Sequence, residues 1–136
     1  MDSKKLGNFG ERIACYYLEN KGYKILDRNY SRKWLSGPQK GEIDIVVEKD
    51  KVISFVEVKT LQQVQGKQKI PALGGDFLLE DKVNFQKQNQ LKKIAQDWLS
   101  EKKISLESKW QIDVISIRVN LASKKAKIRH FKNAVC

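Results

Sequence analysis

The stretch "GEIDIVVEKDKVISFVEVK", residues 41–59, decides the fold class. Its apolar residues form two runs of strand length on either side of "EKDK", which predicts two adjacent strands over about 42–48 and 52–59. Four charged side chains interrupt these runs: Glu42, Asp44, Glu57 and Lys59. Charged residues are rarely buried without partners, so their place on strands of core composition requires a chemical reason.

The faces of the two strands follow from the length of the turn between them. Directly opposed residues of an antiparallel hairpin point to the same side of the sheet. A two-residue loop at Asp50-Lys51 would place Asp44 opposite Glu57, whereas a four-residue loop over 48–51 would place Glu42 there. Either loop puts all four charged residues on one face, and an unbulged three-residue loop would separate them.

Carboxylates held close together repel each other, and three arrangements relieve the repulsion. One acid can keep a proton, a cation such as Lys59 can lie between the acids, or a metal ion can bind. Mg²⁺ (or Mn²⁺) prefers hard oxygen ligands and takes one or two carboxylates together with waters and phosphates. The pattern therefore predicts Asp44 and Glu57 as metal ligands in a phosphodiester hydrolase, with Lys59 facing the phosphate. A solvated, charged strand face is the alternative, because E-x-K patterns are common.

The rest of the chain supplies the helices and the outer strands. Phe9, Ile13, Tyr16 and Tyr17 recur at helical spacing and predict a helix over 7–21 that ends at Gly22. Residues 23–32 alternate as a strand, with Tyr23, Ile25 and Asp27 on one side and Lys24, Leu26 and Arg28 on the other. A long connection over 60–81 precedes a helix over 82–103.

The second helix has an inward stripe of five residues: Leu91, Ile94, Ala95, Trp98 and Leu99. "WQIDVISIRVNL" (110–121) predicts a further strand, and "AKIRHFKNAV" (126–135) predicts a short strand or a tail. The order of elements indicates a single α/β domain over residues 1–136, with a mixed sheet of four to five strands flanked by helices.

Charge is the most informative part of the composition. The chain has 27 Lys and Arg against 16 Asp and Glu, a net charge of +11, which predicts an anionic partner, with nucleic acid favoured over a membrane surface. No apolar run approaches the ~20 residues of a transmembrane helix, and the N-terminus lacks a signal-peptide core, so we expect a cytoplasmic protein. The two cysteines have no metal-ligand spacing, and the single histidine, His130, is more typical of a surface or core residue than of a catalytic base.

Basic residues near the proposed acids are candidates for phosphate contacts. Lys87 precedes Leu91 by four residues and extends the inward stripe, so it faces either the acids or solvent. The predicted contacts with the nucleic-acid backbone are Arg28, Arg32, Lys33, Lys40 and Lys87.

The motifs together resemble the bacterial YraN family, within the PD-(D/E)xK or restriction-endonuclease-like superfamily. The matching segments are "GNFGE" (7–11), "RN" (28–29), "GEID" (41–44), "FVEVK" (55–59), "KQNQLKKIAQDWL" (87–99), "QIDVISI" (111–117) and "IRHFKNAV" (128–135). The resemblance implies a nuclease-type fold related to archaeal Holliday junction resolvases. It also implies a further site acid from the first helix, at the position of Glu11.

The leading hypothesis is a Mg²⁺-dependent endonuclease that acts on DNA, with the branched DNA of repair or recombination as one candidate substrate. In it Asp44 and Glu57 hold the metal, Glu11 and Glu42 assist through water, and Lys59 positions the nucleophile or stabilises the phosphate charge. Two other hypotheses remain open, a catalytically silent nucleic-acid-binding module with the same fold and an RNA-associated or protein-partner subunit. A homodimer is expected if both strands of a junction are cut.

Overall fold

The structure, a computed structural model, describes residues 2–32, 41–62 and 85–134. Its elements in chain order are α1 (Ser3–Asn20), β1 (Lys24–Tyr30), β2 (Ile43–Lys49), β3 (Val52–Gln62), α2 (Phe85–Glu101), β4 (Trp110–Asn120) and β5 (Lys125–Phe131). The five strands form one sheet in the order β1-β2-β3-β4-β5. Only β3 and β4 are parallel among the described strands, and α2 lies between them in the sequence. The predicted mixed sheet flanked by helices is confirmed, and the last segment forms a strand.

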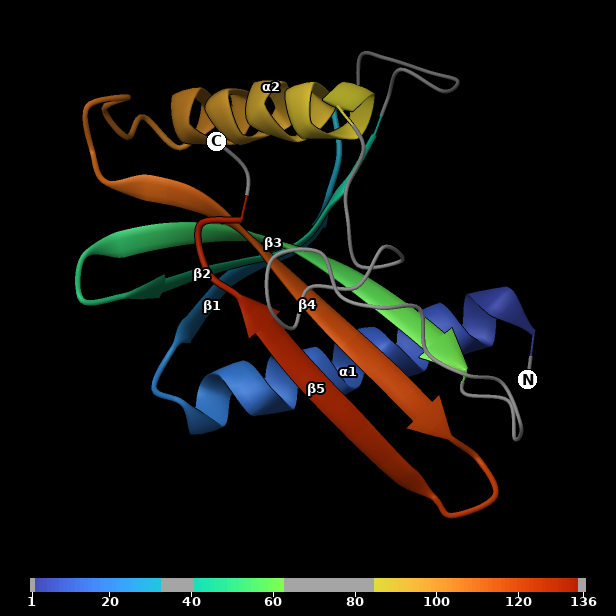
Figure 1. Ribbon diagram of the computed structural model, residues 1–136. Coiled ribbons are helices and arrows are strands. Elements are labelled where there is room, and N and C mark those ends of the chain that lie inside the picture. Colours follow the sequence, from blue (N-terminus) through green and yellow to red (C-terminus); the bar gives the residue numbers. More distant parts are fainter. Residues whose placement is uncertain (1, 33–40, 63–84, 135–136) are drawn as a thin grey trace.

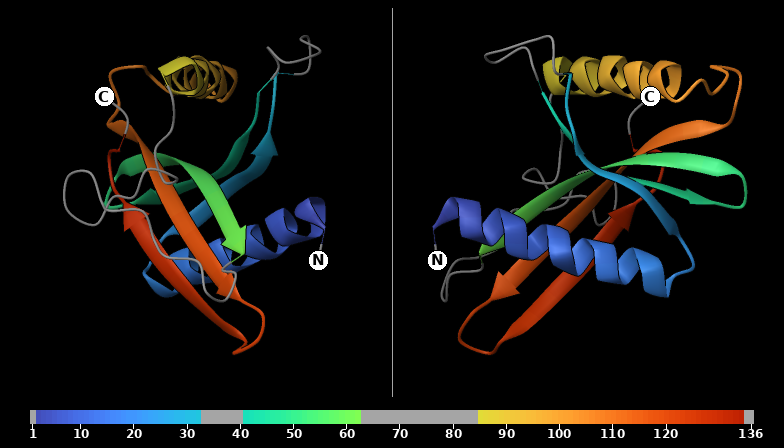
Figure 2. Two further views of the ribbon diagram at one scale, coloured as in Figure 1. Left: turned by 45° about the vertical axis from the view of Figure 1, so that its right-hand side comes forward. Right: turned by 180° about the vertical axis from the view of Figure 1, so that it is seen from behind.

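The sheet is covered by one helix on each face. Figure 1 shows α2 above the sheet and α1 below it, and the view from behind shows α1 running across the opposite face (Figure 2). The α2 side is packed around Phe55, Leu91 and Trp98, and the α1 side around Leu18 and Ile115. Neither of the two described helices is long and apolar enough to cross a membrane.

Helix α1 buries mainly small residues, while Phe9, Ile13 and Tyr17 are partly buried against the same core cluster. The Asp2 carboxylate accepts a hydrogen bond from the backbone N–H of Lys5 at 2.8 Å, so the helix begins earlier than its apolar spacing indicates. Its buried residues are Gly10, Ala14, Cys15 and Leu18, while Tyr16 is 72% exposed. Tyr16, one of the four residues whose spacing predicts this helix, therefore points to solvent. Small side chains let the helix approach the sheet closely, which turns Tyr16 outward.

The stripe predicted for α2 is confirmed, because Leu91, Ile94, Ala95, Trp98 and Leu99 are all buried. Trp98 meets Phe55 of β3 edge to face, with the ring centroids 5.6 Å apart. Its indole N–H donates to Asp27 Oδ2 at 3.0 Å. This contact fixes α2 over β1 and β3.

A β-bulge changes the predicted alternation of β1. The pairing with β2 shifts between Ile25 and Asp27, so that Leu26 is left without a partner. As a result Leu26 packs in the cluster under α2, and Asp27 reaches Trp98 on that same side. Asp27 therefore does not share a face with Ile25, which packs on the α1 side.

The β2–β3 hairpin has the shorter of the two predicted loops. Lys49 pairs with Val52, and the turn residues Asp50 and Lys51 have positive φ angles of 51° and 65°. Two consecutive positive φ angles are typical of a type I′ turn, whose twist matches that of the strands. Strand β3 continues to Gln62, so the first residues of the predicted 60–81 loop belong to the sheet. Residues 63–84 of that segment lie outside the described part of the chain.

Candidate active site

Asp44 and Glu57 face each other across the β2–β3 pair. The register pairs Ile45 with Val56, so the next residues outward are Asp44 and Glu57. Asp44 Oδ2 accepts a hydrogen bond from the backbone N–H of Val58 at 2.8 Å, which ties the carboxylate to the neighbouring strand. Of the two loops considered, the structure has the one that opposes these two acids. Glu42 lies just before β2, outside the opposed pair.

Both opposed carboxylates resist ionisation. Burial, together with the charge of Glu57, raises the pKa of Asp44 to about 8, against the opposite effect of the Val58 hydrogen bond. Burial also raises the pKa of Glu57, although the nearby ammonium groups of Lys87 and Lys59 act to lower it. The fold therefore holds two acids where added positive charge is favourable.

Glu57 has an unsatisfied oxygen in this site. Its side chain is 14% exposed, and Lys87 Nζ lies 3.8 Å from Oε2, beyond hydrogen-bond distance. Among the residues that the structure describes, no donor bonds this buried oxygen. A buried carboxylate oxygen without a donor is costly, and a cation would satisfy it. This oxygen and the neighbouring Asp44 therefore fit the donor set that Mg²⁺ or Mn²⁺ prefers.

The protein does not present a complete cage for a metal. Within residues 2–32, 41–62 and 85–134, no three His, Cys, Asp or Glu side chains form a ready metal-binding group. Mg²⁺ commonly keeps several waters and binds substrate phosphates in addition to one or two carboxylates. The arrangement thus suits an ion whose remaining ligands come from water and substrate.

Glu11 and Glu42 form an outer pair of acids that Asn29 joins. When the amide nitrogen of Asn29 is oriented toward the carboxylates, it donates to Glu42 Oε1 at 2.8 Å and to Glu11 Oε1 at 2.9 Å. Arg28 Nη2 lies 3.9 Å from Glu11 Oε1. Burial and the charge of Glu42 raise the pKa of Glu11, and Arg28 acts to lower it. Both outer acids also act to raise the pKa of Asp44, so the four acids form one electrostatic group.

Gly10 allows α1 to bring Glu11 to the sheet. A Cβ atom at Gly10 would lie 1.7 Å from Thr60 Oγ1, so no other residue fits between the helix and β3 without displacement. Glu11 is the next residue along the helix. The position of the outer acid therefore depends on a close contact between helix and strand.

The structure distributes the predicted basic residues among different surroundings. Lys87 and Arg28 lie beside the acids, opposite Glu57 and Glu11 respectively. Lys59 is two residues beyond Glu57 on the same face of β3. Arg32 Nη1 lies 3.7 Å from Asp97 Oδ2 of α2, and its side chain is only 12% exposed. Lys33 and Lys40 lie outside the described residues.

Sequence reasoning missed Asn29, and its signal was weak. The residue lies in a predicted strand but has φ 52°, a left-handed conformation in which Asn is several-fold enriched over other non-glycine residues. An Asn immediately after Arg28 in a strand could have suggested such a break in regular geometry. The residues that it joins come from two other elements, and no local pattern reveals that contact.

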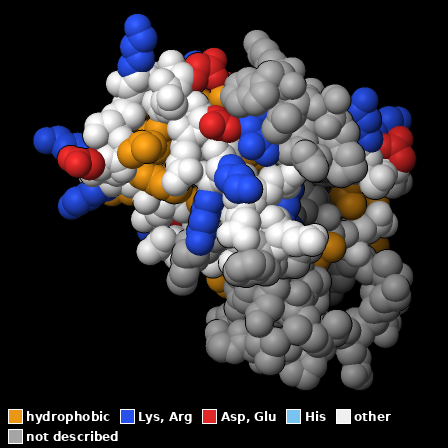
Figure 3. Space-filling model, turned by 90° about the horizontal axis from the view of Figure 1, so that it is seen from above, with side chains coloured by type: hydrophobic (Ala, Val, Ile, Leu, Met, Phe, Trp, Pro, Cys, Tyr) orange, Lys and Arg blue, Asp and Glu red, His pale blue; other side chains and the backbone are white. Residues whose placement is uncertain are grey.

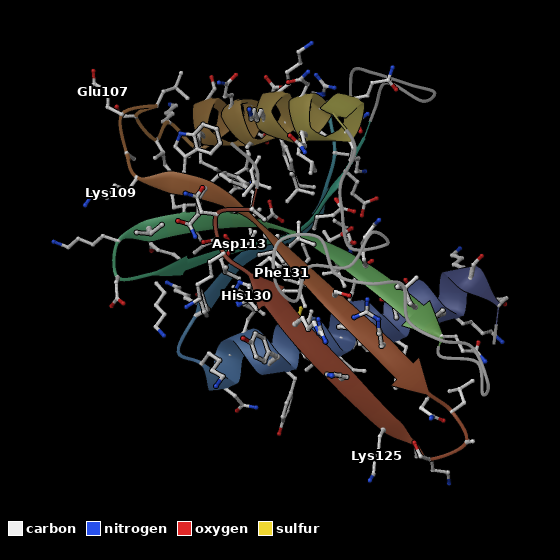
Figure 4. All side chains as sticks on the ribbon, in the orientation of Figure 1. Glu107, Lys109, Asp113, Lys125, His130 and Phe131 are labelled. Atoms are coloured by element: carbon white, nitrogen blue, oxygen red, sulfur yellow. The ribbon has the colours of Figure 1, made fainter. Side chains whose placement is uncertain are left out.

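A second buried polar group lies on the α1 side of the sheet. Asp113 Oδ2 is 2.8 Å from His130 Nε2, and Asp113 Oδ1 accepts from Gln111 Nε2 and from the backbone N–H of Asn133, each at 2.9 Å. Tyr17 of α1 meets the other ring nitrogen of His130 at 3.2 Å. Figure 4 shows Asp113 and His130 adjacent on β4 and β5. Burial acts to raise the pKa of Asp113, but these hydrogen bonds, with His130 first, lower it. With 5% of its side chain exposed, His130 is buried, which decides between the surface and core positions that the sequence left open.

Comparison with known proteins places the chain in a family. The family described as "Uncharacterised protein family UPF0102" matches residues 10–117. The chain belongs to the UPF0102 (YraN) family. A UPF0102 protein of Alkaliphilus oremlandii (strain OhILAs) is 38% identical over 132 residues, covering 97% of this chain and 98% of the relative. UPF0102 proteins of Clostridium botulinum (strain 657 / Type Ba4) and Desulforamulus reducens are each 35% identical, with 97% of this chain covered and 94% and 96% of the relatives.

One solved structure also aligns with this UPF0102 chain. "The structure of Pyrococcus Furiosus SfsA in complex with Ca2+" matches with a TM-score of 0.34 and 16% identity, over 99% of this chain and 65% of that one. Similarity at this level carries no conclusion about activity. The argument for function therefore rests on the site itself.

Proposed function

We propose that this protein is a metal-dependent nuclease that acts on DNA. The observation that carries the proposal is the buried Asp44–Glu57 pair, in which both pKa values are raised and no donor among the described residues bonds Glu57 Oε2. The acid pair attracts a cation, and the net charge of +11 attracts a polyanion such as nucleic acid. The two charges together suit a site where a metal ion and a phosphate backbone meet. The resemblance of its motifs to PD-(D/E)xK nucleases points the same way.

Asp44 and Glu57 are the residues that would hold Mg²⁺ or Mn²⁺. When bound, the ion would polarise a phosphodiester and lower the pKa of a water molecule. Lys59, on the same face beyond Glu57, stabilises the negative charge that builds on the phosphate during attack. Lys87, whose Nζ lies 3.8 Å from Glu57 Oε2, offsets the charge of Glu57 and would contact the same phosphate.

Glu11 and Glu42 hold water rather than the ion. Asn29 donates to one oxygen of each, which orients both carboxylates without neutralising them. Their remaining oxygens can accept hydrogen bonds from an attacking water and give it direction. Arg28 limits the repulsion between them through its ion pair with Glu11.

A nucleic-acid-binding module without catalysis is the second candidate. The observation in its favour is the 3.8 Å approach of Lys87 to Glu57, since a lysine can neutralise an acid pair in place of a metal. In that case DNA would bind through charge alone, and metal would neither raise the stability of the protein nor induce cleavage.

The deciding experiment uses labelled single-stranded, duplex, flap and four-way-junction DNAs with Mg²⁺, Mn²⁺ or EDTA. We expect cleavage of at least one substrate with metal, none in EDTA, and none with Asp44→Asn purified identically. Cleavage that survives in Asp44→Asn would come from another enzyme. Binding without cleavage under all metal conditions would favour the silent module.

A further inference from the structure

The face of the sheet that carries Glu57 also carries several basic residues, arranged in rows across β3, β4 and β5. Paired residues lie side by side on the same face of a sheet. Glu57, Val114 and Phe131 form one row across β3, β4 and β5. Two residues further along the strands, the next rows contain Lys59 with Ser116 and Arg129, then Leu61 with Arg118 and Lys127, and finally Asn120 with Lys125. Successive rows are about 6.6 Å apart, because each residue advances a strand by about 3.3 Å.

Packing confirms that these rows share the face of the acids. Val114 and Phe131 pack in the cluster under α2, whereas Ile117 and Ile128 pack on the α1 side. Alternation along each strand therefore places Arg118, Lys127 and Arg129 on the face that carries Glu57. Figure 1 shows that α2 lies over the first halves of the strands, while β4 and β5 continue well past it.

These rows gather positive charge without acids. From residue 114 to residue 136 the chain has six basic residues and no Asp or Glu. We define the basic track as the five cations of the acid-bearing face: Lys59, Arg118, Lys125, Lys127 and Arg129. Lys125 and Lys127 are exposed, Lys59 and Arg129 are partly buried, and Arg118 is 5% exposed and adds its charge from beneath.

The surface above α2 differs in composition. Viewed from that side, Lys and Arg side chains are scattered and alternate with acidic ones (Figure 3). Asp97 and Glu101 of α2 offset part of its positive charge. The basic track has no such acids among its described rows and begins at Lys59, one row from Glu57, so attraction for an anionic chain is concentrated there.

We propose that the backbone of a bound nucleic acid leaves the Asp44–Glu57 pair and runs over β4 and β5 along the basic track. The inference rests on the proposed function, because it takes the acid pair as the point where the phosphodiester is held. Beyond the row of Phe131, the described residues of the track face include no aromatic side chain that could stack on a base. The track thus reads phosphates, which makes binding independent of sequence and sensitive to salt.

The test compares two double variants with the same loss of charge. Lys125→Ala/Lys127→Ala removes two exposed cations of the track, and Lys102→Ala/Lys109→Ala removes two exposed cations elsewhere. Figure 4 shows Lys109 and Lys125 at opposite ends of the molecule. The affinity of each protein for fluorescein-labelled duplex and four-way-junction DNA is measured over a series of NaCl concentrations in EDTA. Melting temperatures with and without Mn²⁺ report on the acid pair separately.

We expect the track variant to bind roughly tenfold more weakly at moderate salt, with a slope of log affinity against log salt shallower by about 2. The control should keep the wild-type slope to within a few tenths, and Mn²⁺ should stabilise all three proteins alike. Equal losses in both variants would overturn the track and leave the nuclease proposal intact. A wild-type protein that binds neither DNA at low salt would overturn the nuclease proposal, and with it the track.

Discussion

Asp44 is a carboxylate whose ionisation the fold opposes, because burial and Glu57 raise its pKa to about 8. The ordinary pKa of an Asp is about 3.9, so the folded protein keeps a proton that the unfolded chain releases between those pH values. This contribution to stability is complete below about pH 4 and is lost as the pH rises through about 8. In EDTA, the free energy of unfolding should therefore fall with rising pH, by at most about 1.4 kcal/mol per pH unit for this proton.

Urea unfolding of wild type and Asp44→Asn between about pH 5 and pH 8 measures this slope. The variant should show a flatter dependence, retaining the contributions of Glu57 and Glu11, whose pKa values are also raised. Asp113 does not interfere, because its pKa is lowered and its contribution is lost only in more acidic solution. Identical slopes in the two proteins would show that Asp44 is ionised throughout.

Asp44→Asn also separates stability from metal binding. The amide keeps the shape and removes one charge, so the metal-free variant should melt at the wild-type temperature or higher. Mg²⁺ or Mn²⁺ should raise the melting temperature of wild type by mass action and that of the variant much less. Lys59→Ala is the matched comparison: metal should still stabilise it, while cleavage is lost. A metal-induced shift that is equal in wild type and Asp44→Asn would remove Asp44 from the ligand set.

Asn29 bridges Glu11 and Glu42 through its amide, and a substitution that adds one negative charge tests this role. Asn29→Asp replaces the donor between Glu11 and Glu42 with a third carboxylate, so two hydrogen bonds become repulsions. We expect a loss of about 2–3 kcal/mol of stability at neutral pH, and recovery in acid as the group takes up protons. Asn29→Gly suits the φ of 52° and loses the bonds without adding charge, so its loss should be smaller and less dependent on pH. Equal pH dependence in both variants would contradict the bridging role.

The close packing of α1 on β3 depends on the absence of a side chain at Gly10. Gly10→Ala places a Cβ against the side chain of Thr60. Rotation of that side chain cannot remove the contact, because the Thr60 Cβ itself would lie 2.7 Å away, so helix and strand must separate. The expected loss is about 1–3 kcal/mol. Gly7→Ala, on the same helix with nothing within 4 Å, should instead stabilise by about 0.5–1 kcal/mol through better helix propensity. Denaturant unfolding compares the two, and a matching effect at both positions would contradict the close contact.

The β2–β3 turn offers a gain in stability that leaves the acids unchanged. Lys51 has φ 65°, a left-handed conformation that costs a non-glycine residue about 1–2 kcal/mol. Lys51→Gly should stabilise the protein by about 1 kcal/mol, since Asp-Gly suits a type I′ turn. Lys51→Ala keeps the strain while removing the lysine, so it should give no gain. Thermal melts of both variants decide between backbone and side-chain effects.

The sequence predicts elements well where their signal is local. The stripe of α2 and the two central strands follow from spacing, and the opposed acids follow from a two-residue loop. The bulge at Leu26 and the outward turn of Tyr16 do not, because each depends on what the neighbouring element presents. A helix that approaches a sheet through Gly10 and Ala14 buries small residues, and apolar spacing alone favours the aromatic side of such a helix.

At the scale of the molecule, the net charge of +11 predicts an anionic partner but gives no position for it. Arg28 and Arg32 were expected to contact phosphates because they lie near the acids in the sequence, and Lys87 because it extends the inward stripe of α2. All three lie in ion pairs with acids of the protein. The track on β4 and β5 becomes visible only with the register, because Lys59 and Arg129 are far apart in the chain and adjacent in their row.

The parallel pairing of β3 with β4 also affects how the protein folds. The β2–β3 and β4–β5 hairpins are local, whereas the β3–β4 pair joins Ile53 to Trp110 and closes a long loop. Such non-local pairings form slowly, so this closure should set the folding rate. All four acids belong to the N-terminal half of the chain. Until β3 pairs with β4, Lys87 of α2 has not reached Glu57, so this half carries the repulsion between the acids without that lysine. Asp44→Asn should therefore accelerate folding, because it removes the repulsion between Asp44 and the other acids before β3 and β4 have paired.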